Sequence, residues 1–132
     1  MEFVLKTVVI CGSRRYKKEI IKFGADLKKL GVLVFEPYIN SNYDGWGELS
    51  GEFQKYIVLG LELDHFYKIE MADVVFVYNK DGYSGVSVTL EIGCAVAKGK
   101  PVYALEQDTT EICRNVLFRD ITPTPGELIK KL

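Results

Sequence analysis

One glutamate lies where the sequence predicts the apolar face of a helix. The helix expected to end near Lys98 has an inward stripe made of Val88, Ile92, Ala95 and Val96. Glu91 is three residues after Val88 and four before Ala95, so it falls on the same stripe. The helix dipole would explain a solvent-facing glutamate equally well, and a capping box from Ser87 would need its acid at Leu90. We therefore interpret Glu91 as a candidate nucleophile or acid–base group.

A second chemical signal follows the first predicted strand. This loop combines a glycine, a hydroxyl group and three cations, in Gly12, Ser13, Arg14, Arg15 and Lys17. Backbone N–H groups at a helix start favour anions, and the arginine fork matches phosphate oxygens. The alternative is a helix start capped by Ser13 with solvated basic residues. Because cations in a first helical turn oppose the helix dipole, the pattern favours a bound phosphate or another anion.

The elements that must position these residues alternate along the chain. Strands are predicted over residues 3–11, 31–35, 73–78 and 102–105, and helices over 15–30, 53–71 and 88–98. Further on, the sequence predicts a short strand at 116–118 and a helix that Thr124 caps, with Pro125 at its first position. This order predicts a single α/β domain over residues 1–132, with helices on both faces of a flavodoxin- or Rossmann-like parallel sheet of four to five strands.

Ligands of such sheets bind beyond the carboxyl ends of the strands, which singles out three loops, at 12–17, 37–51 and 79–87. Asn79 ends the third strand, where its amide could recognise the edge of a base or could simply form a turn. In the second loop, Trp46 and Tyr43 could form a lid that stacks on a base, or the loop could have no function.

Composition excludes several classes of protein. With 17 Lys and Arg against 18 Asp and Glu the net charge is −1, which argues against a nucleic-acid polymer as partner. No apolar run approaches the roughly 20 residues of a membrane span, and Glu2 is unlike the start of an export signal. The three cysteines form no CxxC pair and His65 is the single histidine, so we expect no metal, no cofactor and a reducing, cytoplasmic location.

Three stretches of the sequence resemble the nucleoside 2-deoxyribosyltransferase superfamily. They are CGS at 11–13, ADVV at 72–75 and GVSVTLEIGCAVAKGKP at 85–101. The pattern looks closest to the 2'-deoxynucleoside 5'-phosphate N-hydrolases, and the resemblance covers roughly residues 6–105. It implies a compact flavodoxin-like sheet, usually a homodimer, that acts on the N-glycosidic bond of a small-molecule nucleotide or nucleoside.

The resemblance also implies roles for individual residues. Glu91 would attack the anomeric carbon and form a glycosyl ester, which water resolves in the hydrolases and a second base resolves in the transferases. The loop that binds the 5'-phosphate would consist of Gly12, Ser13 and Arg15, with help from the third loop through Ser84, Gly85 and Ser87.

The chain differs from the family pattern at two positions. Relatives carry a tyrosine where this chain has Val9, and an aspartate where it has His65, next to Asp64. A histidine could protonate a leaving base, so we expect His65 or Asp64 to assist departure of the base. The sequence therefore predicts N-glycosidic cleavage through Glu91. Its alternatives are a non-catalytic nucleotide or sugar-phosphate binding module and a phosphoribohydrolase acting on a modified nucleotide.

Overall fold

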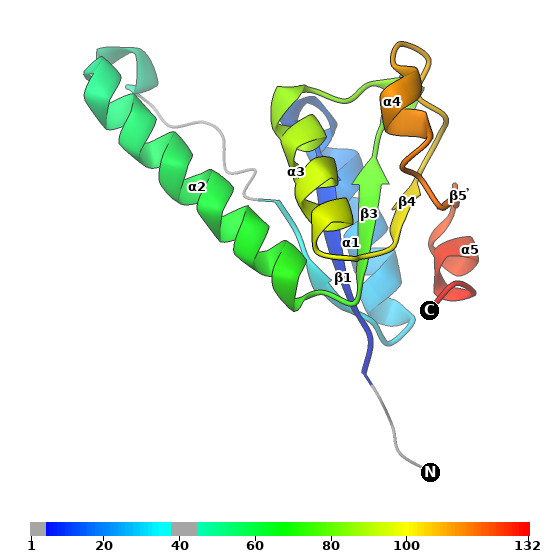
Figure 1. Cartoon of the computed structure of the whole chain (residues 1–132). Helices are drawn as coiled ribbons and strands as arrows, with labels where there is room; N and C mark the ends of the chain where they lie inside the picture. Colours follow the sequence, from blue (N-terminus) through cyan, green and yellow to red (C-terminus); the bar gives the residue numbers. More distant parts are fainter. Residues whose placement is uncertain (1–4, 38–44) are drawn as a thin grey trace.

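The centre of the protein is a sheet of five parallel strands, seen in a computed structural model that describes residues 5–37 and 45–132 (Figure 1). In chain order the strands are β1 (Thr7–Gly12), β2 (Leu33–Phe35), β3 (Val74–Tyr78), β4 (Val102–Ala104) and β5 (Asp120–Ile121). They lie side by side in the order β2-β1-β3-β4-β5, and every neighbouring pair is parallel. The predicted parallel α/β sheet is confirmed.

Helices cover both faces of this sheet. They are α1 (Lys17–Lys29), α2 (Gly51–Met71), α3 (Val86–Ala97), α4 (Ile112–Asn115) and α5 (Pro125–Ile129), with short 3-10 turns η1 (Arg14–Tyr16), η2 (Trp46–Glu48) and η3 (Lys80–Gly82). Residues of α1 and α5 pack on one face, and residues of α2 and α3 pack on the other (Figure 1). Within the described ranges, none of these helices has the length and apolarity that crossing a membrane requires.

Strand β1 sends alternate side chains into the two halves of the core. Val8 and Ile10 pack in the cluster that includes α1, whereas Val9 and Cys11 pack in the cluster that includes α2 and α3. All four are 0% exposed, because β1 is a central strand between β2 and β3 and helices cover both faces of the sheet. The pleat therefore directs the Cys11 thiol toward α2 and α3.

Of two predictions for the carboxyl-terminal part of the chain, one is confirmed and one is wrong. The helix capped by Thr124 is confirmed, since the Thr124 hydroxyl accepts a hydrogen bond from the Glu127 N–H at 3.2 Å. The strand predicted at 116–118 is wrong, and a short strand forms at Asp120–Ile121 instead. Helix α4 precedes it because the Asn115 amide accepts from the Asp108 N–H at 2.7 Å, which closes a turn.

The first predicted strand and the second predicted loop lie only partly within the described residues. The first strand begins at Thr7, later than predicted, and Phe3 lies outside the described residues. Tyr43 also lies outside them. Trp46 begins η2, and its backbone carbonyl accepts a hydrogen bond from the Gln54 amide at 2.8 Å. This bond joins η2 to the start of α2.

Gly82 and Gly99 share a positive φ of 71° and differ in the space around them. A Cβ on Gly82 would come within 2.9 Å of the backbone at Gln107 and Thr109, whereas a Cβ on Gly99 would meet nothing within 4 Å. We expect Gly99→Ala to cost about 1 kcal/mol of unfolding free energy from backbone strain alone. Gly82→Ala should cost about 2–4 kcal/mol because crowding adds to the strain. Urea denaturation of both variants measures the difference, and equal losses would contradict the crowding.

Candidate functional site

The order of the strands places a topological switch point at the carboxyl edge of the sheet. From β1 the chain moves outward to β2 and then returns to β3 on the other side of β1, so the winding direction reverses between β1 and β3. In this architecture, ligands usually bind in the crevice between the two loops that leave the strands at such a point. The first and third loops predicted from the sequence both leave from this position.

Beside this crevice, three side chains from three elements meet in the core. Cys11 comes from the end of β1, His65 from α2 and Glu91 from the second turn of α3. The Nε2 atom of His65 lies 3.3 Å from the Cys11 sulfur and 3.3 Å from Oε1 of Glu91. The three residues are only 0%, 5% and 6% exposed, so this polar cluster is almost free of solvent.

Each side chain reaches the cluster for a local reason. The pleat of β1 turns Cys11 toward α2 and α3, and His65 lies one helical turn before Ile69, which packs on the same face of the sheet. Glu91 shares the buried face of α3 with Val88 and Ile92. The inward direction that the sequence predicts for Glu91 is confirmed.

Burial sets the protonation of the cluster. Loss of solvent, followed by the charge of Glu62, raises the pKa of Glu91 to about 9. Loss of solvent, followed by the charge of Lys68, lowers the pKa of His65 to about 4. The pKa of the Cys11 thiol is raised well above its usual value, mainly by burial. At neutral pH all three groups are therefore uncharged, with Glu91 as the carboxylic acid and His65 as the free imidazole.

The two adjacent candidates on α2 point in different directions. The Asp64 side chain is 55% exposed, and its Oδ2 lies 2.9 Å from the Lys68 ammonium group. Consecutive helical residues are about 100° apart around the axis, so when His65 faces Glu91 its neighbour Asp64 faces solvent. Asp64 thus lies outside the cluster, contrary to the role suggested for it.

Glu62 was not among the residues predicted for the site. It lies one turn before His65 on α2, its charge raises the pKa of Glu91, and its Oε1 is buried without a hydrogen-bond partner among the described residues. The three-residue spacing between Glu62 and His65 is a signal that could have identified it, because such residues share a helix face.

The cationic loop after β1 is tied to the loop after β3. The Ser13 hydroxyl accepts a hydrogen bond from the Arg15 N–H at 3.3 Å, which is the capping contact of the alternative interpretation of this loop. The Arg15 guanidinium lies 3.6 Å from the centre of the Tyr83 ring, a cation–π contact. Arg14 and Arg15 remain exposed. A Cβ on Gly12 would come 2.6 Å from the terminal Cδ1 of Ile20, so a larger residue there would require the Ile20 side chain to move. These exposed cations are available to an anion at the crevice.

The remaining predicted residues of the third loop have distinct surroundings. Ser84 is buried, and its hydroxyl oxygen has no hydrogen-bond partner within the described part of the chain. Gly85 precedes the first residue of α3, and Ser87 is exposed. The Asn79 amide donates to the Glu106 carbonyl at 2.7 Å and accepts from the Glu106 N–H at 3.0 Å. These two bonds connect the ends of β3 and β4, which favours a structural role for Asn79 over recognition of a base.

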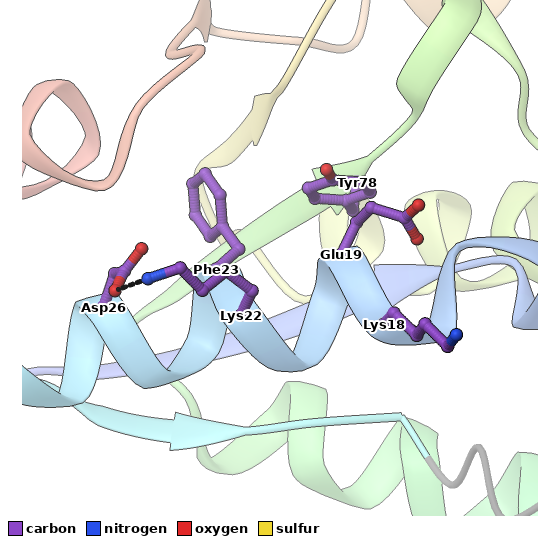
Figure 2. A pocket seen from close by; sticks show the side chains of 6 residues that line it. All are labelled: Lys18, Glu19, Lys22, Phe23, Asp26 and Tyr78. Atoms are coloured by element: carbon purple, nitrogen blue, oxygen red, sulfur yellow. Dashed lines mark hydrogen bonds and ion pairs between the residues drawn. The ribbon is translucent and has the colours of Figure 1, made fainter.

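A shallow groove of about 320 Å³ lies away from this cluster (Figure 2). Its walls are Lys18, Glu19, Lys22, Phe23, Asp26 and Tyr78. Figure 2 shows that all except Tyr78 project from α1, and α1 covers the face of the sheet opposite to α2 and α3. Lys22 and Asp26 form an ion pair within it at 2.9 Å. The groove has no contact with Glu91 and is not a candidate for the same chemistry.

The fold has counterparts among solved structures. A 2-deoxyribosyltransferase from the psychrotolerant bacterium Bacillus psychrosaccharolyticus, a biocatalyst for nucleoside synthesis, matches with a TM-score of 0.64 and 18% identity. The match covers 92% of this chain and 89% of that one. A conserved protein from Enterococcus faecalis V583 matches with a TM-score of 0.57 and 16% identity, over 96% of each chain. No protein-family model and no curated protein matches the sequence. The resemblance seen in the sequence is confirmed at the level of a deoxyribosyltransferase-like fold.

The buried Glu91 makes stability depend on pH in a defined direction. Its folded pKa of about 9 is above its unfolded value, so its favourable contribution is complete at acid pH and is lost as the pH rises toward 9. In Glu91→Gln the side chain cannot ionise, so this loss of stability at higher pH does not occur. We expect the Tm of Glu91→Gln, relative to wild type, to increase by at least about 3 °C between pH 5 and pH 8.

The control for this measurement is Glu52→Gln, at an exposed position in the first turn of α2. Its Tm difference from wild type should stay constant over the same pH range. The lowered pKa of His65 affects wild type and both variants alike, so it cancels in the comparison. A constant difference for Glu91→Gln as well would contradict the raised pKa.

Proposed function

We propose that the protein cleaves the N-glycosidic bond of a (deoxy)nucleoside 5'-monophosphate or a related nucleoside, with Glu91 as the nucleophile. The observation that carries the proposal is the 3.3 Å contact between Glu91 Oε1 and His65 Nε2 in a buried cluster beside the crevice. The exposed cations of the first loop and the deoxyribosyltransferase-like fold support it. With three free cysteines, the described chain also suits the reducing cytoplasm where nucleotides occur.

Proton transfer between the two residues would start the reaction. Glu91 is protonated in the free site and must lose its proton before it can attack, and the neutral His65 Nε2 lies within reach of that proton. With pKa values of about 9 and about 4 the transfer is uphill in the free site. The positive charge that develops at C1' as the bond to the base weakens would have to favour the Glu91 carboxylate. The resulting carboxylate attacks C1' and forms a glycosyl ester. The C1'–N bond breaks, its electron pair goes to the base, and the His65 imidazolium returns the proton to the departing base.

The second half of the reaction restores both groups. His65, neutral again, takes a proton from a water molecule as the oxygen of that water bonds to C1'. The bond from C1' to the Glu91 oxygen breaks and releases the carboxylate, which then regains the proton from His65. A second base in place of water would give transfer instead of hydrolysis. In the first step the proton of Glu91 passes to His65, and in the second step a proton passes from His65 back to Glu91.

The first loop would hold the 5'-phosphate. Arg14 and Arg15 are exposed at the start of α1, and the Tyr83 ring fixes the Arg15 guanidinium from the third loop. A phosphate bound between these loops would reduce the repulsion of cations by the positive end of the helix. Binding energy from the phosphate would then position C1' at Glu91, which is how remote contacts raise turnover.

Free base released from nucleotides tests the proposal. The protein is incubated with the eight common ribo- and deoxyribonucleoside monophosphates and their parent nucleosides, and the products are separated by liquid chromatography. We expect wild type to release base, and Glu91→Gln and His65→Ala to lose at least about a hundredfold in kcat because each removes a reacting group. Asp64→Asn should retain turnover, since its carboxylate points to solvent.

Other outcomes favour the other hypotheses. Unchanged turnover in Glu91→Gln would remove Glu91 from the mechanism. Thermal stabilisation by a nucleotide without release of base would favour a binding module. Turnover restricted to ribonucleotides would favour a phosphoribohydrolase.

We also propose that the protein acts as a homodimer through α2. Of its 21 residues only His65 and Ile69 are buried, and the face opposite to them is apolar. This face consists of Phe53, Tyr56, Leu63, Tyr67 and Met71, which are 50–77% exposed and recur at helical spacing. The amino-terminal half of α2 extends beyond the sheet (Figure 1).

A large apolar stripe on the surface of a helix normally contacts another molecule, so the outer face of α2 predicts a partner. A second copy of the chain supplies a matching stripe, because in a two-fold interface the same surface contacts itself. The dimer is the form in which this helix would be covered on both faces.

Two charges in the outer stripe should separate the dimer. We expect wild type to sediment as a dimer at micromolar concentration and Tyr56→Glu/Tyr67→Glu to sediment as a folded monomer, because the carboxylates would be buried without partners. Ile112→Glu, at a position on α4 that is 78% exposed, is the control and should stay dimeric. A monomeric wild type, or a dimeric double variant, would contradict the proposal.

A further inference from the structure

Three polar side chains of the core converge on one small volume in the Cys11–His65–Glu91 cluster. Two of them approach the same atom of the third, His65 Nε2, each at 3.3 Å. A ring nitrogen carries either one lone pair or one hydrogen, so it can form one good hydrogen bond and not two. The Cys11 thiol and the Glu91 carboxyl group also share a hydrogen bond, so neither is left without a partner. One ion at the centre could replace these shared contacts by a bond to each side chain.

The arrangement matches the ligand shell of a tetrahedral zinc ion. Zinc binds histidine nitrogen and carboxylate oxygen at about 2.0–2.2 Å and thiolate sulfur at about 2.3 Å, which places neighbouring ligand atoms of a tetrahedron about 3.3–3.6 Å apart. The two contacts at Nε2 fall at 3.3 Å, and the ligand atoms of the three residues all lie within 4.8 Å of one another. Little movement would be needed to place an ion between them.

The charges would balance. Zinc(II) would displace one proton from the Cys11 thiol and one from the Glu91 carboxylic acid, while His65 would bind as the neutral imidazole. One dication, one thiolate and one carboxylate give a neutral complex with the release of two protons. A neutral complex suits a cluster that is 0–6% exposed, where a net charge would be costly. Thiolate, imidazole and carboxylate are also donors that zinc accepts together.

Glu62 lies beside the cluster and shares a hydrogen bond with Glu91. It lies one turn before His65 on the same face of α2, and its Oε1 is buried without a hydrogen-bond partner within the described ranges. A buried carboxylate oxygen without a partner is costly, and a nearby cation would offset that cost.

We infer that Cys11, His65 and Glu91 form a site for a divalent zinc-like ion, and that the bound ion inhibits turnover. The inhibitory part rests on the proposed function, because the ion would occupy the Glu91 oxygen that attacks C1' and the His65 nitrogen that carries the proton. The metal and the substrate would therefore compete for the same two side chains. Ligands at positions 11, 65 and 91 form no sequence motif, so the site arises from the fold alone.

Metal binding is measured first, without reference to activity. Protein freed of metal with EDTA is titrated with Zn²⁺ in competition with a chromophoric chelator, and with Co²⁺ to detect the thiolate-to-cobalt charge-transfer band. We expect one ion per chain and a charge-transfer band in wild type. In Cys11→Ser the charge-transfer band should disappear and the zinc affinity should fall at least about tenfold. Loss of a residue that only orients a ligand already lowers metal affinity by about this factor, and loss of a direct ligand should lower it at least as much.

The matched control is Cys113→Ser. Cys113 is exposed and lies 3.6 Å from a Glu111 carboxylate oxygen, so it is the place where a surface ion would bind. We expect Cys113→Ser to keep both the band and the affinity. Because Cys11 is in the core, Glu91→Gln serves as a second variant of similar shape, and it should weaken zinc binding while leaving the cobalt–thiolate band detectable. Loss of binding in Cys113→Ser alone, or full affinity in Cys11→Ser and Glu91→Gln, would overturn the site.

Activity is measured second, as release of base with increasing Zn²⁺. We expect turnover to fall in proportion to zinc occupancy and to return when EDTA is added. Stimulation by zinc, or full turnover at full occupancy, would overturn the inhibitory role. Zinc binding without any turnover would contradict the proposed function and leave the site standing, and turnover without zinc binding would do the opposite. The two failures are thus distinguishable.

Discussion

Burial of the Glu91 carboxyl group between the sheet, α2 and α3 is the constraint on which the site depends. Removing a carboxylate from water is so unfavourable that the group holds its proton near neutral pH. In the proposed mechanism, the adjacent His65 imidazole is the group placed to accept that proton. Glu62 increases the effect by adding a second acidic group. The same lack of solvent explains why the cluster could bind either a reacting sugar or a metal ion strongly, since electrostatic interactions are little screened there.

Helix α2 connects this chemistry to the surface of the molecule. One of its faces brings His65 to the core, and the opposite face presents a continuous apolar stripe to solvent. Covering that stripe with a second chain would fix the position of α2 and therefore the distance between His65 and Glu91. Dimer formation and the geometry of the site would then both depend on α2. This dependence would explain why α2 has apolar residues on two opposite faces.

The loops after β1 and β3 contact each other and the neighbouring strand ends. The cationic first loop is joined to the third loop by the contact of Arg15 with Tyr83, while the Asn79 amide connects the ends of β3 and β4 through Glu106. Asn79 has a structural role, but in the sequence it looks the same as a ligand-binding residue. Both kinds of residue are polar and follow the end of a strand. Only the hydrogen-bond partners distinguish them.

The sequence by itself determined the features that depend on local periodicity. Continuous runs of apolar residues predicted the strands, the residues from Thr124 to Glu127 predicted the helix cap, and the 3.6-residue repeat predicted the inward direction of Glu91. The fold confirms all three. The strand predicted at 116–118 failed because hydrogen bonds between Asp108 and Asn115 hold a turn that no local propensity records. The tertiary structure alone decided that Cys11 meets His65 across 54 residues of chain, and that His65 rather than Asp64 faces Glu91. Periodicity fixes which face a side chain occupies, whereas the packing of separate elements fixes what that face meets.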